Sequence, residues 1–222
     1  MALLFLLVIL TACAAIPQDL SGKMFTFPLE TNTASVRLTT SRQTFSALTV
    51  CLRSFTDLRR SHSIFSLATQ SVDNDFLIYW DNAGNDIDYH VRNKYTNFGV
   101  EYKLNMWQSI CSTWDSESGV GQLWIDGKPS SRKFISSETI SGPIIIVLGQ
   151  EQDSFGGGFD LQQSFVGMMS DVHMWDQVLT PCEIQNYMDE LNFTPGNVVN
   201  WKMQDFQITG KVLIEEKQKN CL

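Results

Sequence analysis

Short hydrophobic runs recur along the chain, rich in β-branched and aromatic residues and separated by Gly, Asn, Asp and Ser. Such runs are typical of β-strands, because branched and aromatic side chains pack well on a pleated sheet. Asp126-Gly127, which follows one run, indicates a hairpin turn with positive φ angles. The pattern predicts an all-β sandwich in a single domain without internal repeats. The predicted strands are 45–52, 64–67, 76–80, 107–114, 122–125, 144–148, 165–175 and 207–214.

One segment has the period of a helix instead. Residues 180–183 (Thr-Pro-Cys-Glu) form a capping box with proline at the first helical position. Hydrophobic residues follow at helical spacing, at Ile184, Tyr187, Met188 and Leu191. We therefore predict one short α-helix that runs to about Leu191, stops before Pro195-Gly196 and packs against a sheet.

Residues 1–15 have the composition of a secretory signal peptide. A hydrophobic run, Leu3–Leu10, precedes small residues with an A-x-A pattern that ends at Ala14. Cleavage after Ala14 or after Ala15 fits, and a bacterial lipoprotein signal with Cys13 as the lipidated residue is the alternative. The run is too short to remain as a membrane anchor, so we expect a secreted extracellular domain over residues 16–222.

The chain is acidic, which restricts its partners. Its 222 residues carry 16 Lys and Arg against 24 Asp and Glu, a formal net charge of -8. Without a basic run such a chain is a poor candidate for nucleic acid, and it repels anionic membrane surfaces. No hydrophobic run beyond the first segment indicates a transmembrane helix. The composition is better suited to cations, wherever the carboxylates converge.

Four cysteines follow the signal segment. They are Cys51, Cys111, Cys182 and Cys221, and none forms the C-x-x-C motif of zinc sites or thiol oxidoreductases. In an oxidising compartment four cysteines indicate two disulfides, with three connectivities open.

Enzyme motifs are missing from the sequence. It contains no G-x-S-x-G, no H-E-x-x-H and no dinucleotide-binding fingerprint. The histidines His62, His90 and His173 are scattered, which disfavours a histidine metal site. Some jelly-roll glycosidases carry E-x-D-x-x-E on one strand, but here Gly156 stands in place of the second glutamate. We therefore expect no catalytic activity.

The segment 148–163 concentrates oxygen ligands. Glu151 and Asp153 are two residues apart and point the same way on an extended segment, and Asp160 follows a triple glycine. Converging carboxylates repel one another unless a cation lies between them. Calcium suits this set, because it takes roughly six to eight oxygens in irregular geometry. A solvated acidic loop is the alternative, and the pattern alone favours it.

The loop and the segments around it resemble the pentraxin family, and within it the short pentraxins of the C-reactive protein and serum amyloid P type. Residues 149–157 (Gly-Gln-Glu-Gln-Asp-Ser-Phe-Gly-Gly) are similar to the calcium loop of that family. Residues 165–167 and 171–176 are similar to the stretch after that loop. Residues 110–116 match most of the signature H-x-C-x-[ST]-W-x-[ST], with Ser109 in place of His. The resemblance covers essentially the whole chain after the signal segment.

This resemblance implies a flattened, lectin-like antiparallel jelly-roll sandwich with one helix on a face. It also implies a disulfide between Cys51 and Cys111. Cys182 and Cys221 are additional to the family's usual pair. We expect them to bridge each other within the chain, with a bond between subunits as the alternative. Asn192 begins the only N-x-[ST] sequon, and the proline after it lowers its expected use.

The resemblance further implies two calcium ions per subunit, which share two carboxylates. The first ion is expected on Asp73, Asn74, Glu151, Asp153 and the backbone carbonyl of Gln152. The second is expected on Glu151, Asp153, Asp160 and Gln163. Without the resemblance, Asp73 is only another turn residue.

The ligands that the family implies are phosphocholine, phosphoethanolamine and anionic polysaccharides, held by an anionic group on the calcium pair. Tyr79 stands where the family has an aromatic residue that contacts choline methyl groups. The family assembles as cyclic pentamers with all calcium sites on one face, so avidity strengthens binding to dense surfaces. The opposite face is expected to recruit complement or receptors.

The function implied is that of a secreted, calcium-dependent pattern-recognition protein of innate immunity, of the acute-phase type. The alternative is a calcium-dependent carbohydrate-binding or adhesion module of the related jelly-roll lectin type. Two ions per subunit favour the first interpretation, and a single ion favours the second.

Overall fold

The structure is a computed structural model that describes residues 17–218. The predicted signal segment, with both cleavage positions and Cys13, lies outside the described residues, and so does Cys221. Within residues 17–218, no helix is both long enough and hydrophobic enough to cross a membrane.

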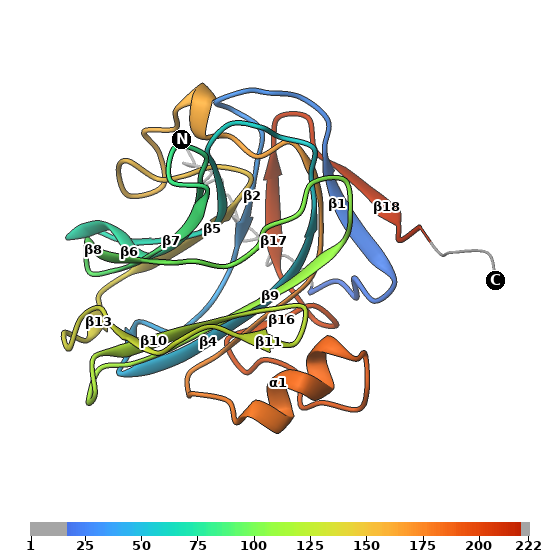
Figure 1. Ribbon diagram of the computed structural model, residues 1–222. Coiled ribbons are helices and arrows are strands. Elements are labelled where there is room, and N and C mark those ends of the chain that lie inside the picture. The colour runs from blue at the N-terminus through green and yellow to red at the C-terminus, as the bar shows by residue number, and fades with distance from the viewer. Residues whose placement is uncertain (1–16, 219–222) are drawn as a thin grey trace, which may run out of the picture.

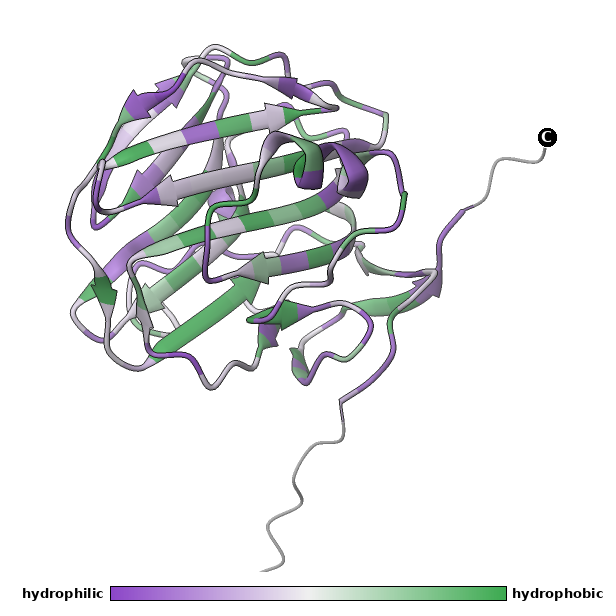
Figure 2. Cartoon of the chain, turned by 90° about the horizontal axis from the view of Figure 1, so that it is seen from below, coloured by the Kyte–Doolittle hydropathy of each residue, from purple (hydrophilic) through white to green (hydrophobic). Residues whose placement is uncertain are grey.

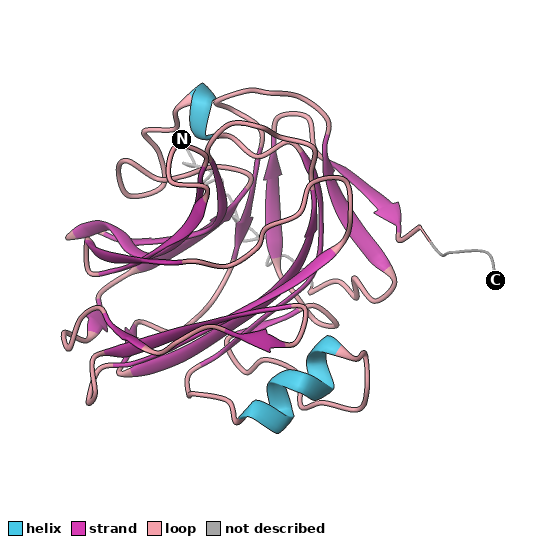
Figure 3. Cartoon of the chain, viewed as in Figure 1, coloured by secondary structure: helices cyan, strands magenta, loops and turns pink. Residues whose placement is uncertain are grey.

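Two antiparallel sheets face each other as a sandwich, and one helix lies on the outer side of the larger sheet (Figures 1 and 3). The nine-stranded sheet has the order β11 (Lys128–Pro129), β10 (Val120–Ile125), β9 (Gln108–Asp115), β4 (Ala47–Phe55), β15 (Gly167–Trp175), β1 (Lys23–Phe27) and β18 (Leu213–Glu216), with β12 (Lys133–Phe134) on β10 and β16 (Val199–Asn200) on β15. The seven-stranded sheet has the order β17 (Phe206–Thr209), β2 (Ser35–Leu38), β14 (Ile144–Leu148), β5 (His62–Thr69), β6 (Val72–Asp81), β7 (Asp86–Val91) and β8 (Lys94–Phe98), and a separate ribbon pairs β3 (Thr44–Phe45) with β13 (Ile140–Ser141). The predicted all-β jelly-roll sandwich with one helix is confirmed.

Alternating strand positions fill the two sides of the larger sheet, because successive side chains of a strand point to opposite faces. In β4, Val50 and Leu52 belong to the core between the sheets, whereas Cys51 belongs to a second cluster under the helix. Cys51 is bonded to Cys111, its register partner on β9, which confirms the implied disulfide. Closing a loop of 60 residues stabilises the fold by roughly 4 kcal/mol in the loop-entropy account.

The helix α1 (Pro181–Met188) begins as predicted and ends earlier. Thr180 Oγ1 accepts a hydrogen bond from Glu183 N, and the Glu183 carboxylate accepts one from Thr180 N, which completes the capping box. The predicted end near Leu191 is wrong, because Glu190 adopts a left-handed φ of 56°. Leu191 is consequently exposed and does not join the packed face. Figure 2, seen from the side of α1, shows hydrophobic residues in green that alternate with polar residues along the strands.

The strand predictions hold best where the hydrophobic run is long. β14 has the predicted bounds, and the hairpin at Asp126-Gly127 is confirmed, with φ angles of 48° and 78° between β10 and β11. The predicted strand 207–214 is instead two strands, β17 and β18, because Gly210 turns the chain with a φ of 70° and the halves join different sheets. β1, β2, β7 and β8 are missed, since their sequences lack an unbroken hydrophobic run.

The three histidines lie on different strands, β5, β7 and β15, and all are withdrawn from water. Burial lowers the pKa of His62, His90 and His173 to about 4 each. A histidine in an unfolded chain has a pKa of about 6.5. Between these values the unfolded chain binds protons that the folded chain does not, so stability is complete above about pH 6.5 and is lost as the pH falls towards 4.

We expect the free energy of unfolding to decrease between pH 7 and pH 5, by about 1–2 kcal/mol for the fully buried His62. His62 Nδ1 lies 2.9 Å from the carbonyl of Arg60, and His62→Asn keeps a donor for that carbonyl while removing the titrating group. Urea unfolding of wild type and variant at both pH values measures the effect. An identical loss of stability in the two proteins would show that His62 does not contribute.

Candidate metal centre

A closed loop between β14 and β15 carries most of the predicted calcium ligands. The chain leaves β14 at Gly149, turns outward and returns, and Phe165 N donates to the Gly149 carbonyl at 3.0 Å. Gly149 has a φ of 90° and lies against the ring of Phe27, which leaves no room for a side chain. The short 3₁₀ helix η1 (Leu161–Gln163) forms the returning half of the loop. Figure 1 places η1 and α1 on opposite sides of the molecule.

Gln152 and two glycines hold this loop in shape. The buried Gln152 amide donates to the carbonyls of Ser66 and Ile145 at 3.2 Å each, and its Oε1 accepts from Gly156 N at 3.0 Å. Gly156 and Gly158 have φ angles of 77° and 74°, which only glycine adopts without strain. The fold therefore uses the side chain of Gln152 to hold the loop in shape, and the backbone carbonyl of Gln152 stays a predicted ligand.

Glu151 is the exceptional residue of the loop. It is 2% exposed, and neither of its carboxylate oxygens has a hydrogen-bond partner. Burial, together with the negative charges of nearby Asp153 and Asp73, raises the pKa of Glu151 to about 8. A buried carboxylate that lacks a partner is strongly destabilising, so such groups are normally paired or bound to metal. A cation bound here would offset the cost of burying this carboxylate near like charges.

Like the Glu151 carboxylate, two amide oxygens from the predicted ligand set lack a hydrogen-bond partner. Asn74 Oδ1, on β6, and Gln163 Oε1, on η1, are buried and have no hydrogen-bond partner. Asn74 lies beside Glu151, where it opposes the rise of the Glu151 pKa, and its backbone N–H donates to Asn93 Oδ1 at 3.1 Å. Carboxylate and amide oxygens are the ligands that calcium takes. The residues present therefore fit calcium.

Not every predicted ligand converges on Glu151. The residues that interact with it through charge or polar contact are Asp73, Asn74 and Asp153. Asp160 is exposed and caps η1, because its Oδ1 accepts a hydrogen bond from Gln162 N at 2.9 Å. In the part of the chain that the structure describes, no group of three His, Cys, Asp or Glu side chains is arranged to hold a metal by itself. A metal held here would need amide and carbonyl oxygens as ligands as well.

Tyr79 lies on β6 beside this centre. Burial raises its pKa, and the charge of Glu151 acts in the same direction, which places the phenol near that carboxylate. Tyr79 pairs with Asp88 across β6 and β7, so the two side chains share one face of the sheet. Burial and the charges of Asp81 and Asp86 raise the pKa of Asp88. Tyr79 is thus close to Glu151 and shares a sheet face with Asp88.

Arg60 positions the returning half of the loop. This role could not be predicted from the sequence pattern. Its guanidinium donates to the carbonyls of Gln162 at 2.9 Å and Ser164 at 2.6 Å, and it pairs with Glu30 at 3.4 Å. These contacts fasten η1 to the connection between β4 and β5. No local signal marks Arg60, because its carbonyl partners lie 102 and 104 residues away along the chain.

Comparison with known proteins identifies the class that this fold and loop define. The family model described as the pentaxin family matches residues 23–216. The chain therefore belongs to the pentaxin (pentraxin) family, whose members are recognition proteins and not enzymes. The resemblance drawn from the motifs is confirmed, and so is the expectation that the chain is not an enzyme.

Individual members of the family are similar to this chain over most of its length. It is 40% identical to serum amyloid P-component of Mus musculus over 201 residues, which cover 90% of this chain and 89% of that protein. It is 40% identical to C-reactive protein of Xenopus laevis over 206 residues, covering 91% and 86%. Among solved structures it resembles a native heptameric SAP-like pentraxin from Limulus polyphemus, with a TM-score of 0.78, 28% identity and coverage of 88% and 95%. Membership supports, in general terms, calcium-dependent pattern recognition in innate immunity.

Glu151→Gln tests whether the buried carboxylate is built for a cation. In chelator at about pH 9 we expect the variant to unfold at a higher temperature than wild type, because the amide carries no charge to bury. In excess calcium we expect wild type to gain stability and the variant to gain little. Calorimetric scans with EGTA and with calcium chloride measure both differences.

The matched control for this test is Glu117→Gln, which neutralises an exposed glutamate. It should respond to calcium like wild type. If Glu151→Gln gains as much stability from calcium as wild type does, Glu151 is not a ligand.

Proposed function

We propose that this protein is a secreted, calcium-dependent pattern-recognition protein of innate immunity that binds phosphate headgroups or anionic glycans on microbial or damaged cells. The observation that carries the proposal is the buried Glu151 carboxylate, whose two oxygens have no hydrogen-bond partner. A cation removes the cost of burying that charge. The similarity to a serum amyloid P-component supports an extracellular location.

Two calcium ions per subunit are part of this proposal, and they share Glu151 and Asp153. The first would be held by Asp73, Asn74, Glu151, Asp153 and the backbone carbonyl of Gln152. The second would be held by Glu151, Asp153, Asp160 and Gln163. Bound calcium supplies positive charge that faces solvent, so an anionic ligand can bind to an acidic protein. The unpartnered oxygens of Asn74 and Gln163 support one ligand in each set.

The surroundings of the centre favour a zwitterionic ligand such as phosphocholine or phosphoethanolamine. The anionic phosphate would lie on the calcium ions. The ring of Tyr79 would contact the cationic end through a cation–π interaction. Asp88, which shares a sheet face with Tyr79, adds negative charge at the same end. An anionic polysaccharide would use the calcium ions without needing these carboxylates.

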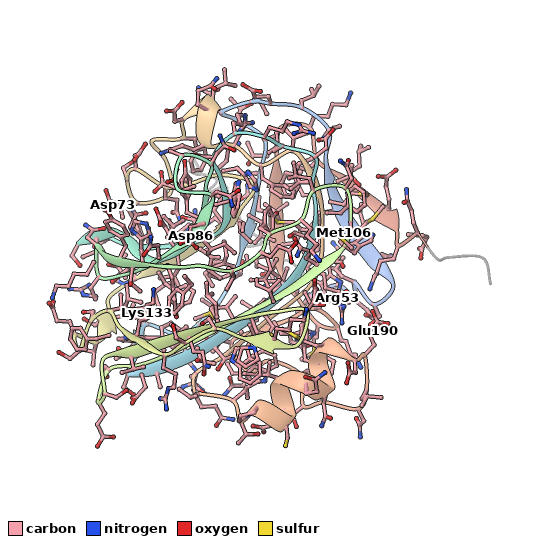
Figure 4. The ribbon with its side chains drawn as sticks, viewed as in Figure 1. Arg53, Asp73, Asp86, Met106, Lys133 and Glu190 are labelled. Carbon is pink, nitrogen blue, oxygen red and sulfur yellow. A yellow bond between two sulfur atoms is a disulfide. The ribbon has the colours of Figure 1, made fainter. Side chains whose placement is uncertain are left out.

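Assembly into a ring, of five subunits in our proposal, would present several centres together. A solved relative is heptameric, which supports a multimer. Weak sites displayed on one face bind dense surfaces far more tightly than single ligands. Asp73, at the metal centre, lies far from Arg53 and Glu190 near α1 (Figure 4). The side around α1, with a cavity of about 540 Å³, would remain free for complement or receptors.

The proposal is tested by calorimetric calcium titration, followed by capture on immobilised phosphocholine and phosphoethanolamine with and without chelator. We expect two ions per subunit and capture that chelator reverses. One ion, with capture on glycans only, would favour the carbohydrate-binding or adhesion module. If no calcium binds, the proposed function is contradicted and the fold assignment is unaffected.

Tyr79→Ala should separate headgroup recognition from calcium binding. We expect about a tenfold loss of affinity for phosphocholine, because a partly desolvated cation–π contact contributes on the order of 1–2 kcal/mol. The calcium stoichiometry should not change, since the phenol is not in the ligand set. Asp88→Asn should also lower the affinity for phosphocholine, and it should leave the affinity for inorganic phosphate unchanged. An equal loss of affinity for phosphocholine and for inorganic phosphate would show that Tyr79 and Asp88 do not contact the cationic end of the ligand.

A further inference from the structure

The main chain of Asn74 is held on both sides by a hairpin turn. This turn joins β7 to β8, and its two central residues are Arg92 and Asn93. Asn93 N donates to the Asn74 carbonyl at 3.0 Å, and Asn93 Oδ1 accepts from Asn74 N at 3.1 Å. These hydrogen bonds fix the peptide groups before and after the Cα atom of Asn74. The turn therefore decides where the side chain of this predicted ligand begins.

The turn acts on the predicted ligands of the first ion. Asn74 Oδ1 is buried without a hydrogen-bond partner, so no protein group orients this oxygen directly. Asn74 N also donates to Asp73 Oδ1 at 3.0 Å. Asp73 and Asn74 thus meet at one N–H, and Asn93 Oδ1 is the acceptor there that is not itself a predicted ligand.

A buried ion pair fastens the turn to β6. Arg92 Nη1 lies 3.0 and 3.1 Å from the two carboxylate oxygens of Asp75, which is fully buried. Arg92 N donates to the Asp75 carbonyl at 3.1 Å, and Thr69 Oγ1 donates to the Asp75 carboxylate at 2.6 Å. Because Asp75 directly follows Asn74 in the chain, the ion pair holds the turn beside that residue.

Arg92 adopts a backbone conformation that is unfavourable for arginine. The φ angles of Arg92 and Asn93 are 57° and 56°, in the left-handed region that suits glycine and asparagine. A strained residue persists in such a conformation where its surroundings hold it. The contacts of the Arg92 guanidinium with Asp75 and, at 3.8 Å, with Glu138 supply that hold.

We propose that Asn93 and the Asp75–Arg92 ion pair are positioning residues for the first calcium ion. They do not bind the ion, but they hold Asn74 where its Oδ1 can do so. This inference rests on the calcium-dependent function proposed above. Groups that hold metal ligands in place raise metal affinity by about 10- to 100-fold. The second ion should not depend on the turn, because its expected ligands include neither Asp73 nor Asn74.

Calorimetric calcium titration of Asn93→Gly tests the role of the Asn93 side chain. Glycine suits the φ of 56° and keeps the N–H that donates to the Asn74 carbonyl, so the variant removes only the acceptor Oδ1. We expect the Kd of one ion to rise about tenfold and the Kd of the other to stay the same. The thermal unfolding temperature in EGTA should be no lower than that of wild type.

Two ligand variants identify the ion that responds. Asn74→Ala should weaken the same ion as Asn93→Gly, and Asp160→Ala should weaken the other. If Asn93→Gly leaves both Kd values unchanged, or shifts the ion that Asp160→Ala weakens, the positioning role is refuted.

Asn85→Gly is the matched control. Asn85 is exposed, has a φ of 51° and lies in the neighbouring turn between β6 and β7, so the same substitution is made in the same backbone conformation. It should leave both Kd values unchanged. Asn93→Asp retains an acceptor for Asn74 N and should bind the first ion at least as tightly as wild type. If Asn93→Asp loses as much affinity as Asn93→Gly, the hydrogen bond to Asn74 N is not the cause.

The double variant Asp75→Asn with Arg92→Gly tests the ion pair. It removes one charge of each sign, so the net charge beside the centre is unchanged and no buried carboxylate loses its partner. We expect the Kd of the first ion to rise, because the turn is no longer fastened to β6. An unchanged or lower Kd would show that the ion pair has no positioning role.

The same titrations separate this inference from the proposed function. A wild type that binds two calcium ions, with affinities that all the turn variants share, would refute the positioning role and leave the function standing. A wild type that binds no calcium would contradict the function, and the positioning role with it.

Discussion

A carboxylate buried without a protein partner is the constraint on which the organisation of this protein depends. Glu151 carries two oxygens that nothing in the described chain satisfies, and like charges from Asp73 and Asp153 increase the cost. The loop cannot turn this group towards water easily, because the neighbouring Gln152 is anchored to Ser66 and Ile145. The fold therefore keeps this carboxylate buried, and a bound cation would offset the cost of burying its charge.

The sandwich contributes by holding distant segments against that carboxylate. β14 and β6 are both neighbours of β5 in the seven-stranded sheet, and the start of β6 is level with the start of β14. The loop after β14 folds back over the sheet, since Gln152 bonds to Ser66 and Ile145, and this brings Glu151 near Asp73 and Asn74. Arg60 then fastens η1 from the opposite half of the chain. On the other side of the molecule α1 covers the disulfide Cys51–Cys111 and leaves the metal centre open. The helix and the predicted metal centre consequently lie on separate surfaces of the sandwich.

The fold could be predicted wherever local chemistry is strong. Long hydrophobic runs marked the central strands, and the capping box marked the start of α1. The end of α1 and the split of 207–214 into two strands could not be predicted, because each depends on how one residue, Glu190 or Gly210, is placed by its surroundings. Polar edge strands such as β8 were missed for a similar reason, since pairing with a neighbour and not their own composition makes them strands.

For the site, the sequence by itself determined the oxygen-rich loop, its glycines and its likeness to a calcium loop. Only the tertiary structure decided that Glu151 is buried and unpartnered, that Asp160 caps η1, and that Tyr79 lies near Glu151 and beside Asp88. The physical reason is that ligand type is a property of single residues, which a sequence displays. Burial and proximity arise from contacts between strands far apart in the chain, and no local pattern encodes them.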